Sequence, residues 1–519
     1  MTRHAVLLFA LAARMTAQPG IGQNGVVNAA SQIPPTLAGG ALARGTAFTI
    51  HGVRFGAKPV ISLEHGRSVI KVPVLSSQPK RIDAVLPPDA PLGPASLSVS
   101  VDGQAGKAFA IDIVASNPGI FTRNGLGWGP GRIEHVGPRK ARSPNSFSNP
   151  AHAGQRVTLR VAGLGGAQTA RVVIGNRTVV AQATATSDPG VEELILEIPR
   201  DATQGCYVPV YIKASPGRAS NVATMALRNR AGPCEAGAVP LLDNTRIGMA
   251  VLTRTRMRRK DTASDLVFDE AIVAFAAKDK EPVLAPLLLL PPAGTCTAYW
   301  SSFQSVSILP DSPTAALVSD LGGRGLDAGP RVTIRHGSQS RNAPRDPAAP
   351  GFFRVRLGSN DRRGGRAAFP PLLEPGLNSI TGYGGSDVGP FAIQRASPPE
   401  FAWTGRDALN VVDRGRDLTV HWSGVSADRL MLVVATNVDQ ITTANGICLC
   451  AAAGSAGKMT IPAALLANLP ASKDMPGIPY DQLVLVSIPA KAGPSLPVSG
   501  LNGGGVIDLY AVGRFVDFR

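Results

Sequence analysis

One stretch of this sequence occurs twice. Gly45–Gly56 reads GTAFTIHGVRFG, and Gly154–Gly165, which begins 109 residues later, reads GQRVTLRVAGLG. Each copy is followed at a similar distance by a second shared stretch, Ile82–Pro87 in the first and Leu194–Pro199 in the second. Alternating apolar residues bounded by Gly and Pro are typical of short β-strands, and a repeat of about 110 residues is typical of tandem β-sandwich modules. The repeat therefore predicts two modules with one strand plan and one register.

The glycine and proline content indicates an all-β fold. The 519 residues include 57 Gly and 44 Pro, and these are spread along the chain. Glycine supplies turn positions with positive φ, and proline interrupts helices. A chain of this length also exceeds what one hydrophobic core can hold. We therefore expect an all-β protein of tandem immunoglobulin-like β-sandwich domains, roughly three to four in a row.

The first copy of the repeat resembles the opening of the IPT/TIG immunoglobulin-like family. That opening has the form Gly-Thr-x-Val-Thr-Ile-x-Gly-x-x-Phe-Gly, and Gly45–Gly56 is similar to it at almost every position. Asn28–Ser31, Ser116–Phe121 and Asn149–Ala151 resemble, more narrowly, a repeated two-module region of uncharacterised secreted soil-bacterial proteins. The resemblance covers residues 24–230 and implies a fold but no activity.

These patterns divide the chain into five expected segments. They are a signal peptide at 1–17, an IPT/TIG-like β-sandwich at 24–115, a second immunoglobulin-like β-sandwich at 116–234, a β-rich middle domain at 235–395, and a C-terminal β-sandwich at 397–519. The last segment resembles the tail domain of the same secreted proteins, which adds architecture only.

The first residues have the pattern of an export signal. Arg3 and His4 precede the apolar stretch Ala5–Ala13, and the sequence Arg-Met-Thr-Ala follows as far as the small residue Ala17, although Arg14 fits the pattern poorly. A basic start, a short apolar core and small residues are typical of a secretory signal peptide. Cleavage after Ala17 and cleavage after Ala12 both remain open. No later apolar stretch is long enough for a transmembrane helix, so we expect the protein in the periplasm, at the cell surface or outside the cell.

The chain has five cysteines, which in an exported protein indicate disulfides rather than metal ligands. Cys206 and Cys234 lie at the two ends of the closing strands of the second module, so a bridge between them is expected. The odd number leaves one thiol over. Cys296 could pair with Cys448 or with Cys450, and the sequence leaves this choice open.

The formal net charge is +16, and 40 of the 52 basic residues are Arg. A bias toward GC-rich codons could produce this excess, and so could selection for an anionic partner. Few aromatic residues lie near the densest basic run, so we expect no nucleic acid partner and consider anionic glycans or other cell-surface components instead. The candidate anion-binding patch consists of Arg254, Arg256, Arg258, Arg259 and Lys260.

Trp128 lies in a glycine-rich connector between the first two modules. Two interpretations are open for it. It could be an exposed aromatic contact for a sugar, or it could pack into the seam between domains, where large aromatic side chains are often buried.

No catalytic signature is present in the sequence. The chain contains neither a His-Glu-x-x-His motif nor a Gly-x-Ser-x-Gly motif. We therefore expect no catalytic residue, no cofactor and no metal, and a non-catalytic exported protein with a binding or structural role. The alternative is a polysaccharide hydrolase or lyase with its site in 235–395, which would need a cleft with converging carboxylates. A weaker option is an assembly protein that presents edge strands to partners.

Overall fold

The structure is a computed structural model that describes residues 18–214, 217–234, 246–260, 263–277, 290–302, 324–347, 349–360, 369–439, 441, 444–473, 481–491, 496 and 498–519. The expected signal peptide and most of its cleavage region lie outside these residues. The described chain is all-β, and its one α-helix is the single turn α1 (Ala463–Leu466). No helix in the described parts is long and apolar enough to cross a membrane.

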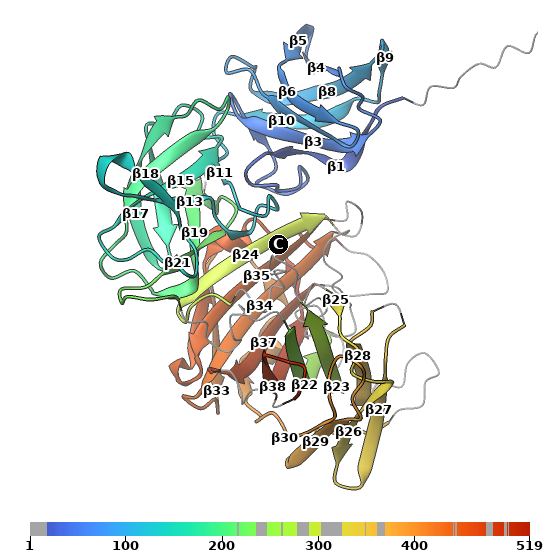
Figure 1. The fold of residues 1–519 in the computed structure, drawn as a ribbon. Helices are drawn as coiled ribbons and strands as arrows, with labels where there is room; N and C mark the ends of the chain where they lie inside the picture. Colours follow the sequence, from blue (N-terminus) through green and yellow to red (C-terminus); the bar gives the residue numbers. More distant parts are fainter. Residues whose placement is uncertain are drawn as a thin grey trace, which may run out of the picture.

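The first module is a two-sheet sandwich with an immunoglobulin-type strand order (Figure 1). One sheet has the order β1 (Gly20–Asn28), β3 (Ala47–Val53), β7 (Arg81–Val85) and β6 (Val74–Gln78). The other has the order β2 (Leu42–Ala43), β10 (Phe109–Val114), β8 (Gly93–Val101), β4 (Val60–His65) and β5 (Ser68–Val72), with β9 (Gln104–Ala105) beside β8. Inward residues of both sheets form one core, in which Phe48, Ile50, Leu63 and Leu97 are fully buried.

The second module follows the same plan with one change. One half contains β14 (Arg142–Pro144), β13 (Ile133–Val136), β15 (Arg156–Ala162), β18 (Glu192–Glu197) and the short β11 (Gly119–Ile120). The other half contains β16 (Thr169–Ile174), β19 (Gly205–Ala214), β21 (Ala223–Leu227), β12 (Gly129–Pro130) and β20 (Arg218–Ala219). The continuous strand β17 (Arg177–Ala185) pairs with β16 and β18 and so joins the halves, whereas in the first module Pro73 separates the corresponding β5 and β6.

The two copies of the repeat occupy the same place in their modules. Ile50 of β3 lies opposite Ile82 of β7, and Leu159 of β15 lies opposite Leu194 of β18, which are the positions that the repeat aligns. Gly45 and Gly154, which open the copies, have φ of 69° and 77°, a conformation that favours glycine. The common register that the repeat predicts is therefore present.

The rest of the chain builds one large sheet. Its order is β24 (Thr295–Ser302), β35 (Ala444–Ala453), β34 (Arg429–Asp439), β37 (Gln482–Pro489), β38 (Gly503–Phe515), β22 (Arg246–Arg258), β23 (Asp265–Ala277) and β25 (Arg324–Gly325), and β28 (Phe352–Ser359) also pairs with β23. β22 runs parallel to β38, from Ile247 opposite Gly503 to Arg258 opposite Arg514. This sheet crosses the boundary that we expected between residues 395 and 397, so the two expected segments share one sheet.

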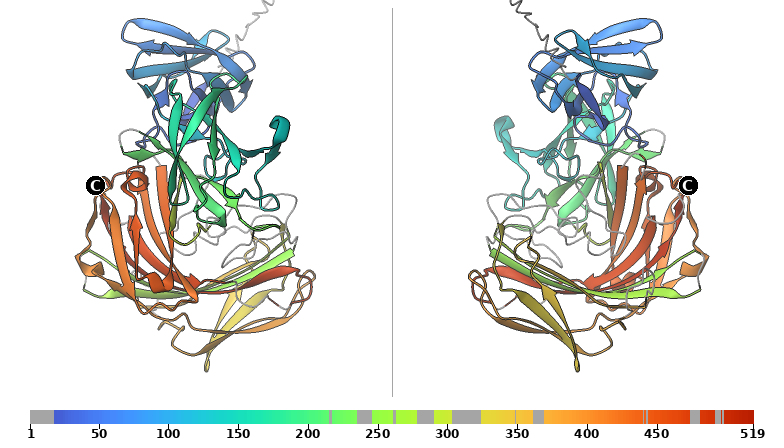
Figure 2. Two further views of the ribbon diagram at one scale, coloured as in Figure 1. Left: turned by 90° about the vertical axis from the view of Figure 1, so that its left-hand side faces the viewer. Right: turned by 90° about the vertical axis from the view of Figure 1, so that its right-hand side faces the viewer.

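Both faces of the large sheet are covered. On one face, Val251 and Leu509 belong to a core that also contains Trp128 and Tyr207 of the second module, and Figure 2 shows the sheet curving beneath that module. On the other face lie two small sheets and a two-stranded pair. They are β27 (Gln339–Pro344), β26 (Arg331–His336), β29 (Leu377–Gly382) and β30 (Phe391–Ala396); β31 (Ala402–Thr404), β33 (Leu418–Ser423) and β36 (Lys458–Ile461); and β32 (Val411–Val412) with β39 (Asp517–Phe518).

Candidate functional site

The basic run of the sequence forms the end of β22 and the residues just after it. In a strand, alternate side chains point to opposite faces, so Arg254, Arg256 and Arg258 point to the face that carries Leu252, while Met257 packs in the core beneath the second module. Each of these arginines faces a carboxylate of a neighbouring element.

Arg254 forms a buried ion pair with Asp269 of β23. Its Nε and Nη2 donate to the two carboxylate oxygens at 2.9 Å each, and the two side chains are 7% and 0% exposed. Glu374 lies 3.0 Å from the same guanidinium, and the backbone N–H of Leu373 donates to Asp269. Burial alone would lower the pKa of Arg254, but the hydrogen bond and charge of Asp269 raise it above its usual value. The pair therefore joins β22, β23 and the segment before β29.

Arg256 and Arg258 share Asp265, at 3.2 and 2.7 Å, and Arg406 of the short 3-10 turn η5 (Arg406–Ala408) lies 3.0 Å from the same carboxylate. Burial would raise the pKa of Asp265, but its hydrogen bond with Arg258 and the charges of Arg406 and Arg258 hold it below its usual value. Asp407 pairs with Arg258 and Arg406 in turn. This network borders a cleft of about 490 Å³ beside Trp403.

The expected basic patch is therefore corrected by the structure. Arg254, Arg256 and Arg258 are held in ion pairs within the chain, and Lys260 contacts Asp517. Arg259, which is half-buried, makes no ion pair with a described residue, so it is the one arginine of the run left over. The sequence showed the density of basic residues, but the main carboxylate partners lie on the next strand, β23. Asp265 is 7 residues from Arg258 and Asp269 is 15 residues from Arg254, and the antiparallel pairing of β22 with β23 brings them together.

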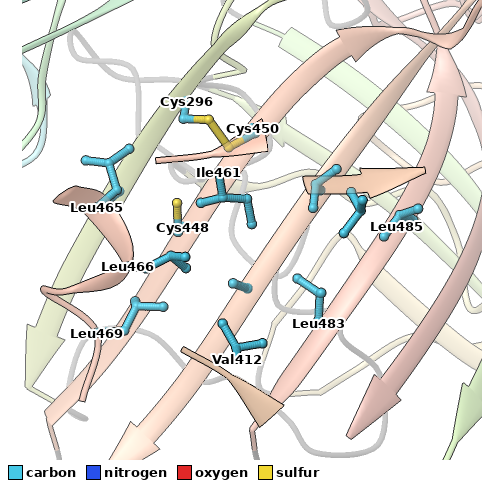
Figure 3. Close-up of a cluster of buried hydrophobic side chains, with 14 of the residues drawn as sticks. Cys296, Val412, Cys448, Cys450, Ile461, Leu465, Leu466, Leu469, Leu483 and Leu485 are labelled. Atoms are coloured by element: carbon cyan, nitrogen blue, oxygen red, sulfur yellow. A yellow bond between two sulfur atoms is a disulfide. The ribbon is translucent and has the colours of Figure 1, made fainter. Parts of the chain in front are cut away.

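The expected disulfide is present, and a second one resolves the open choice. Cys206 and Cys234 are bonded, with Cα atoms 5.5 Å apart. Cys296 of β24 is bonded to Cys450, which lies directly opposite on β35. Cys448 remains free in the same apolar cluster (Figure 3), where burial raises the pKa of its thiol to about 12. A thiol with so high a pKa is a poor nucleophile, so we assign Cys448 to the core.

Trp128 lies in the seam rather than in solvent. It is 9% exposed, and its ring meets that of Tyr299 of β24 edge to face, with centroids 5.5 Å apart. The second of the two interpretations thus holds. The connector that carries Trp128 fixes the second module to the large sheet.

The second module also contains a cleft that the sequence did not reveal. Where β1 of the first module has an irregularity between Ile21 and Val26, the second module has an inserted loop between β11 and β13, from Phe121 to Arg132. The loop and the outer face of β13, β15 and β18 enclose about 340 Å³. The side chains around this cleft, which we call the module-2 cleft, are those of Arg123, Arg132, Ile133, Glu134, Pro144, Thr158, Arg160 and Glu193.

The arginines at the module-2 cleft differ in whether they have partners within the chain. Arg160 pairs with Asp188 and lies over the ring of Phe121, 5.9 Å from its centroid. Arg142, beside the cleft, donates to Thr158 at 2.6 Å and to Glu193 at 2.9 Å. In contrast, Arg123 and Arg132 are exposed, and among the described residues neither guanidinium has an ion-pair partner.

A weak signal of this cleft existed in the sequence. Arg156, Thr158 and Arg160 alternate with buried Val157 and Leu159, so their outward direction could be read from the period of the strand. The loop that closes the cleft has no counterpart in the first copy, and its conformation depends on contacts with the large sheet. Among the described residues, no group of three His, Cys, Asp or Glu side chains is arranged to hold a metal ion.

Comparison with known proteins gives no family for this chain. A search with protein-family models finds no match, and a search of curated proteins finds none. Solved structures align over long stretches at low similarity. A Bacteroides ovatus mixed-linkage glucan utilization locus protein in complex with a heptasaccharide is 11% identical, with 78% of this chain and 79% of that chain covered and a TM-score of 0.14.

Two further structures give the same result. A Ca²⁺-stabilized adhesin with which an Antarctic bacterium binds ice is 10% identical, with 96% and 99% covered and a TM-score of 0.12. Immunoglobulin domains 1–4 of Sidekick-1 are 10% identical, with 92% and 96% covered and a TM-score of 0.12. TM-scores this low say nothing about function. The function must therefore be inferred from the geometry of this chain.

Proposed function

We propose that this chain is a non-catalytic, exported binding protein whose second module binds a carboxylated glycan in the module-2 cleft. The observation that carries the proposal is that Arg123 and Arg132 are exposed beside a cavity of about 340 Å³ without a carboxylate partner. A volume of this size lies at the lower end of the range for small-ligand sites, so it suits a short acidic oligosaccharide.

The residue types at the module-2 cleft match that ligand. A guanidinium can donate two parallel hydrogen bonds to one carboxylate, and two guanidinium groups favour a ligand with at least one negative charge. The Glu134 and Glu193 carboxylates can accept hydrogen bonds from sugar hydroxyls. Because the arginines are exposed, we expect modest affinity that falls as ionic strength rises.

A non-catalytic role is supported by the carboxylates of the other cleft. Asp265 and Asp407 both border the cleft beside Trp403, where a glycosidase would place an acid and a second carboxylate. A general acid needs a raised pKa, whereas the arginines around Asp265 hold its pKa below the usual value. These two carboxylates therefore suit an ion network better than acid–base catalysis.

Export is supported by the two disulfides. Disulfides persist in oxidising compartments and are rare in the reducing cytosol. Both bridges are in well-packed positions, since Cys206, Cys234, Cys296 and Cys450 are all buried. This fits the export signal that the sequence suggests.

The test is titration calorimetry of the full chain with trigalacturonate, with a neutral glucan trisaccharide as the reference ligand. We expect binding of the acidic ligand alone, and at least a tenfold loss of affinity in R123A/R132A, which corresponds to about 1.4 kcal/mol. The control is R171A/R200A, which removes two exposed arginines of the same module that do not border the cleft. No binding of trigalacturonate, or an equal loss in both variants, would contradict the proposal.

A further inference from the structure

We infer that the chain has a second glycan-binding surface, on the outer side of the four-stranded sheet β27-β26-β29-β30, and that it binds an extended polyuronate chain. This inference shares its ligand class with the proposed function but depends on different residues. We call this surface the β26 face. It consists of the outward side chains of the four strands together with Tyr383, which directly follows β29.

The alternation of β26 decides which side chains belong to this face. Val332 and Ile334 are fully buried in the core against the large sheet, together with Ile380 of β29. Successive side chains of a strand point to opposite sides. Arg331, Thr333 and Arg335 therefore point outward, and the burial pattern agrees, because both arginines are exposed.

The strand register arranges the outward side chains in three rows. In the first row, the guanidinium of Arg331 lies over the ring of Tyr383, 5.5 Å from its centroid, and Tyr383 is 70% exposed. In the second, Thr333 lies between Asn342 and Thr381. In the third, Arg335 lies between Ser340 and Ser379, and Gln394 follows on β30.

The charge of the β26 face is not balanced by the face itself. The four strands contain no Asp or Glu. Two of their arginines do not contribute to this face. Arg395 pairs with Asp508, and Arg341 alternates with the exposed Ser340 and Asn342 and so points to the side of the buried Ala343. Arg331 and Arg335 have no ion-pair partner among the described residues, so the face presents two free cations to solvent. Charge complementarity therefore points to an anionic partner.

The spacing of the two cations selects the kind of anion. At about 3.4 Å per residue, Arg331 and Arg335 are roughly 14 Å apart along the strand. Between them lie the hydroxyl of Thr333 and the side-chain amide of Asn342. The hydroxyl donates to the amide oxygen at 2.8 Å, which leaves the amide N–H groups to donate to sugar hydroxyls. A polyuronate offers both widely spaced carboxylates and free hydroxyls. A densely sulfated chain would need more cations, and a nucleic acid strand would need more than the one exposed aromatic ring.

The aromatic ring adds a surface on which a sugar can stack. Tyr383 exposes most of its side chain, and the contact with Arg331 holds its ring in place. A ring that is already ordered loses less conformational entropy when a ligand binds. We therefore expect Tyr383 to contact a sugar next to the carboxylate that Arg331 binds.

The two proposed sites lie on opposite sides of the large sheet. Figure 1 shows the second module at the upper left and β26, β27, β29 and β30 at the lower right, with the large sheet between them. We expect a trisaccharide to bind at the module-2 cleft and to be too short to reach the β26 face from there. A long chain that reaches both sites would bind with higher avidity than either site gives alone.

The test measures binding of full-length variants to immobilised polygalacturonate and, separately, to trigalacturonate in solution. In R331A/R335A we expect at least a tenfold weaker interaction with the polymer and unchanged trigalacturonate binding at the module-2 cleft. Y383A should weaken polymer binding by a smaller factor. The control R171A/R200A removes the same charge from an unrelated surface and should change neither measurement.

Failure of this inference can be told apart from failure of the proposed function. If polymer binding is equal in R331A/R335A and the control, the β26 face is not a glycan site, whatever R123A/R132A does. If R123A/R132A binds trigalacturonate as wild type does, but R331A/R335A binds the polymer more weakly, then the cleft proposal fails and the inference about the β26 face is supported. Stronger competition by dextran sulfate than by soluble polygalacturonate, at equal charge concentration, would overturn the choice of a polyuronate.

Discussion

Two strands of this protein each carry more than one arginine on a single face and use these arginines in opposite ways. In β22, Arg254, Arg256 and Arg258 point toward Asp269 and Asp265 and connect neighbouring elements. In β26, Arg331 and Arg335 point to solvent, and the sheet around them contains no carboxylate. The denser run is thus the less available one, and what distinguishes the two strands is the residues across from each arginine.

Burial explains this difference. A buried charge is costly unless it is paired and hydrogen-bonded, so Arg254 and Arg258, whose side chains are 7% and 14% exposed, require partners, whereas Arg256 is more exposed and depends less on its partner. An exposed arginine is solvated by water and needs none. A free pair of exposed arginines therefore costs little in folding and remains available for a ligand.

The largest expected effect comes from breaking the buried pair. In D269A, Arg254 keeps a buried charge with Glu374 as its remaining partner, and Leu373 loses an acceptor. Removing one member of a buried pair costs about 3–5 kcal/mol. Denaturant unfolding followed by intrinsic fluorescence should show a loss of this size in the transition of the large sheet.

The double variant R254M/D269L distinguishes the cost of leaving one buried charge unpaired from the cost of removing both charges. It replaces both members by apolar residues of similar size, which is often close to neutral in other proteins. It should recover most of the stability lost in D269A. A double variant as unstable as D269A would mean that the pair is required for the fold itself.

The repeat allowed the first two modules to be predicted from sequence, because it contained both turns and core positions. Gly45 and Gly154 mark the same turn, and the pairs that the repeat aligns are paired in space. The large sheet offered no such signal. β22 and β38 are about 250 residues apart and are adjacent through a parallel pairing that no local pattern encodes.

The same limit explains the candidate sites. Arg254 and its main partner Asp269 are only 15 residues apart, but their contact depends on the pairing of β22 with β23, and the second partner, Glu374, is 120 residues away. Arg331-Val-Thr-Ile-Arg335 was visible as a strand, yet the absence of carboxylates around it depends on which strands share its sheet. Alternation predicts the direction of a side chain, whereas availability depends on tertiary neighbours.

Acid should weaken the β22 network and leave the β26 face unaffected. The pKa of Asp265 is below its usual value of 3.8, so its contribution to stability is present at neutral pH and is lost as the pH falls through the lowered pKa. Thermal unfolding at stepwise lower pH should show this loss below the usual aspartate range. D265N should be less stable at neutral pH, and its unfolding temperature should fall less as the pH is lowered. An equal fall in D265N and wild type would contradict this role.

A smaller effect is expected from making β26 resemble β22. In S379D, a carboxylate is placed directly opposite Arg335 on the exposed face. A cross-strand pair of opposite charges contributes roughly 0.2–1 kcal/mol, so stability should rise slightly. Polygalacturonate binding should fall, because one free cation is neutralised. S379N is the control, since it changes size without charge, and equal binding in the two variants would argue against a role for Arg335.

The smallest effect is expected for the stability of R331A/R335A. Both side chains are exposed, neither makes an ion pair with a described residue, and surface substitutions of this kind usually change the free energy of unfolding by less than about 0.5 kcal/mol. The cation–π contact of Arg331 with Tyr383 is lost in addition, and because such a contact contributes about 0.5–1 kcal/mol at an exposed site, the total loss should stay near or below about 1 kcal/mol. Denaturant unfolding beside wild type and D269A measures the difference directly. A loss approaching that of D269A would place the arginines of β26 in the same structural class as those of β22, and the contrast between the two strands would no longer hold.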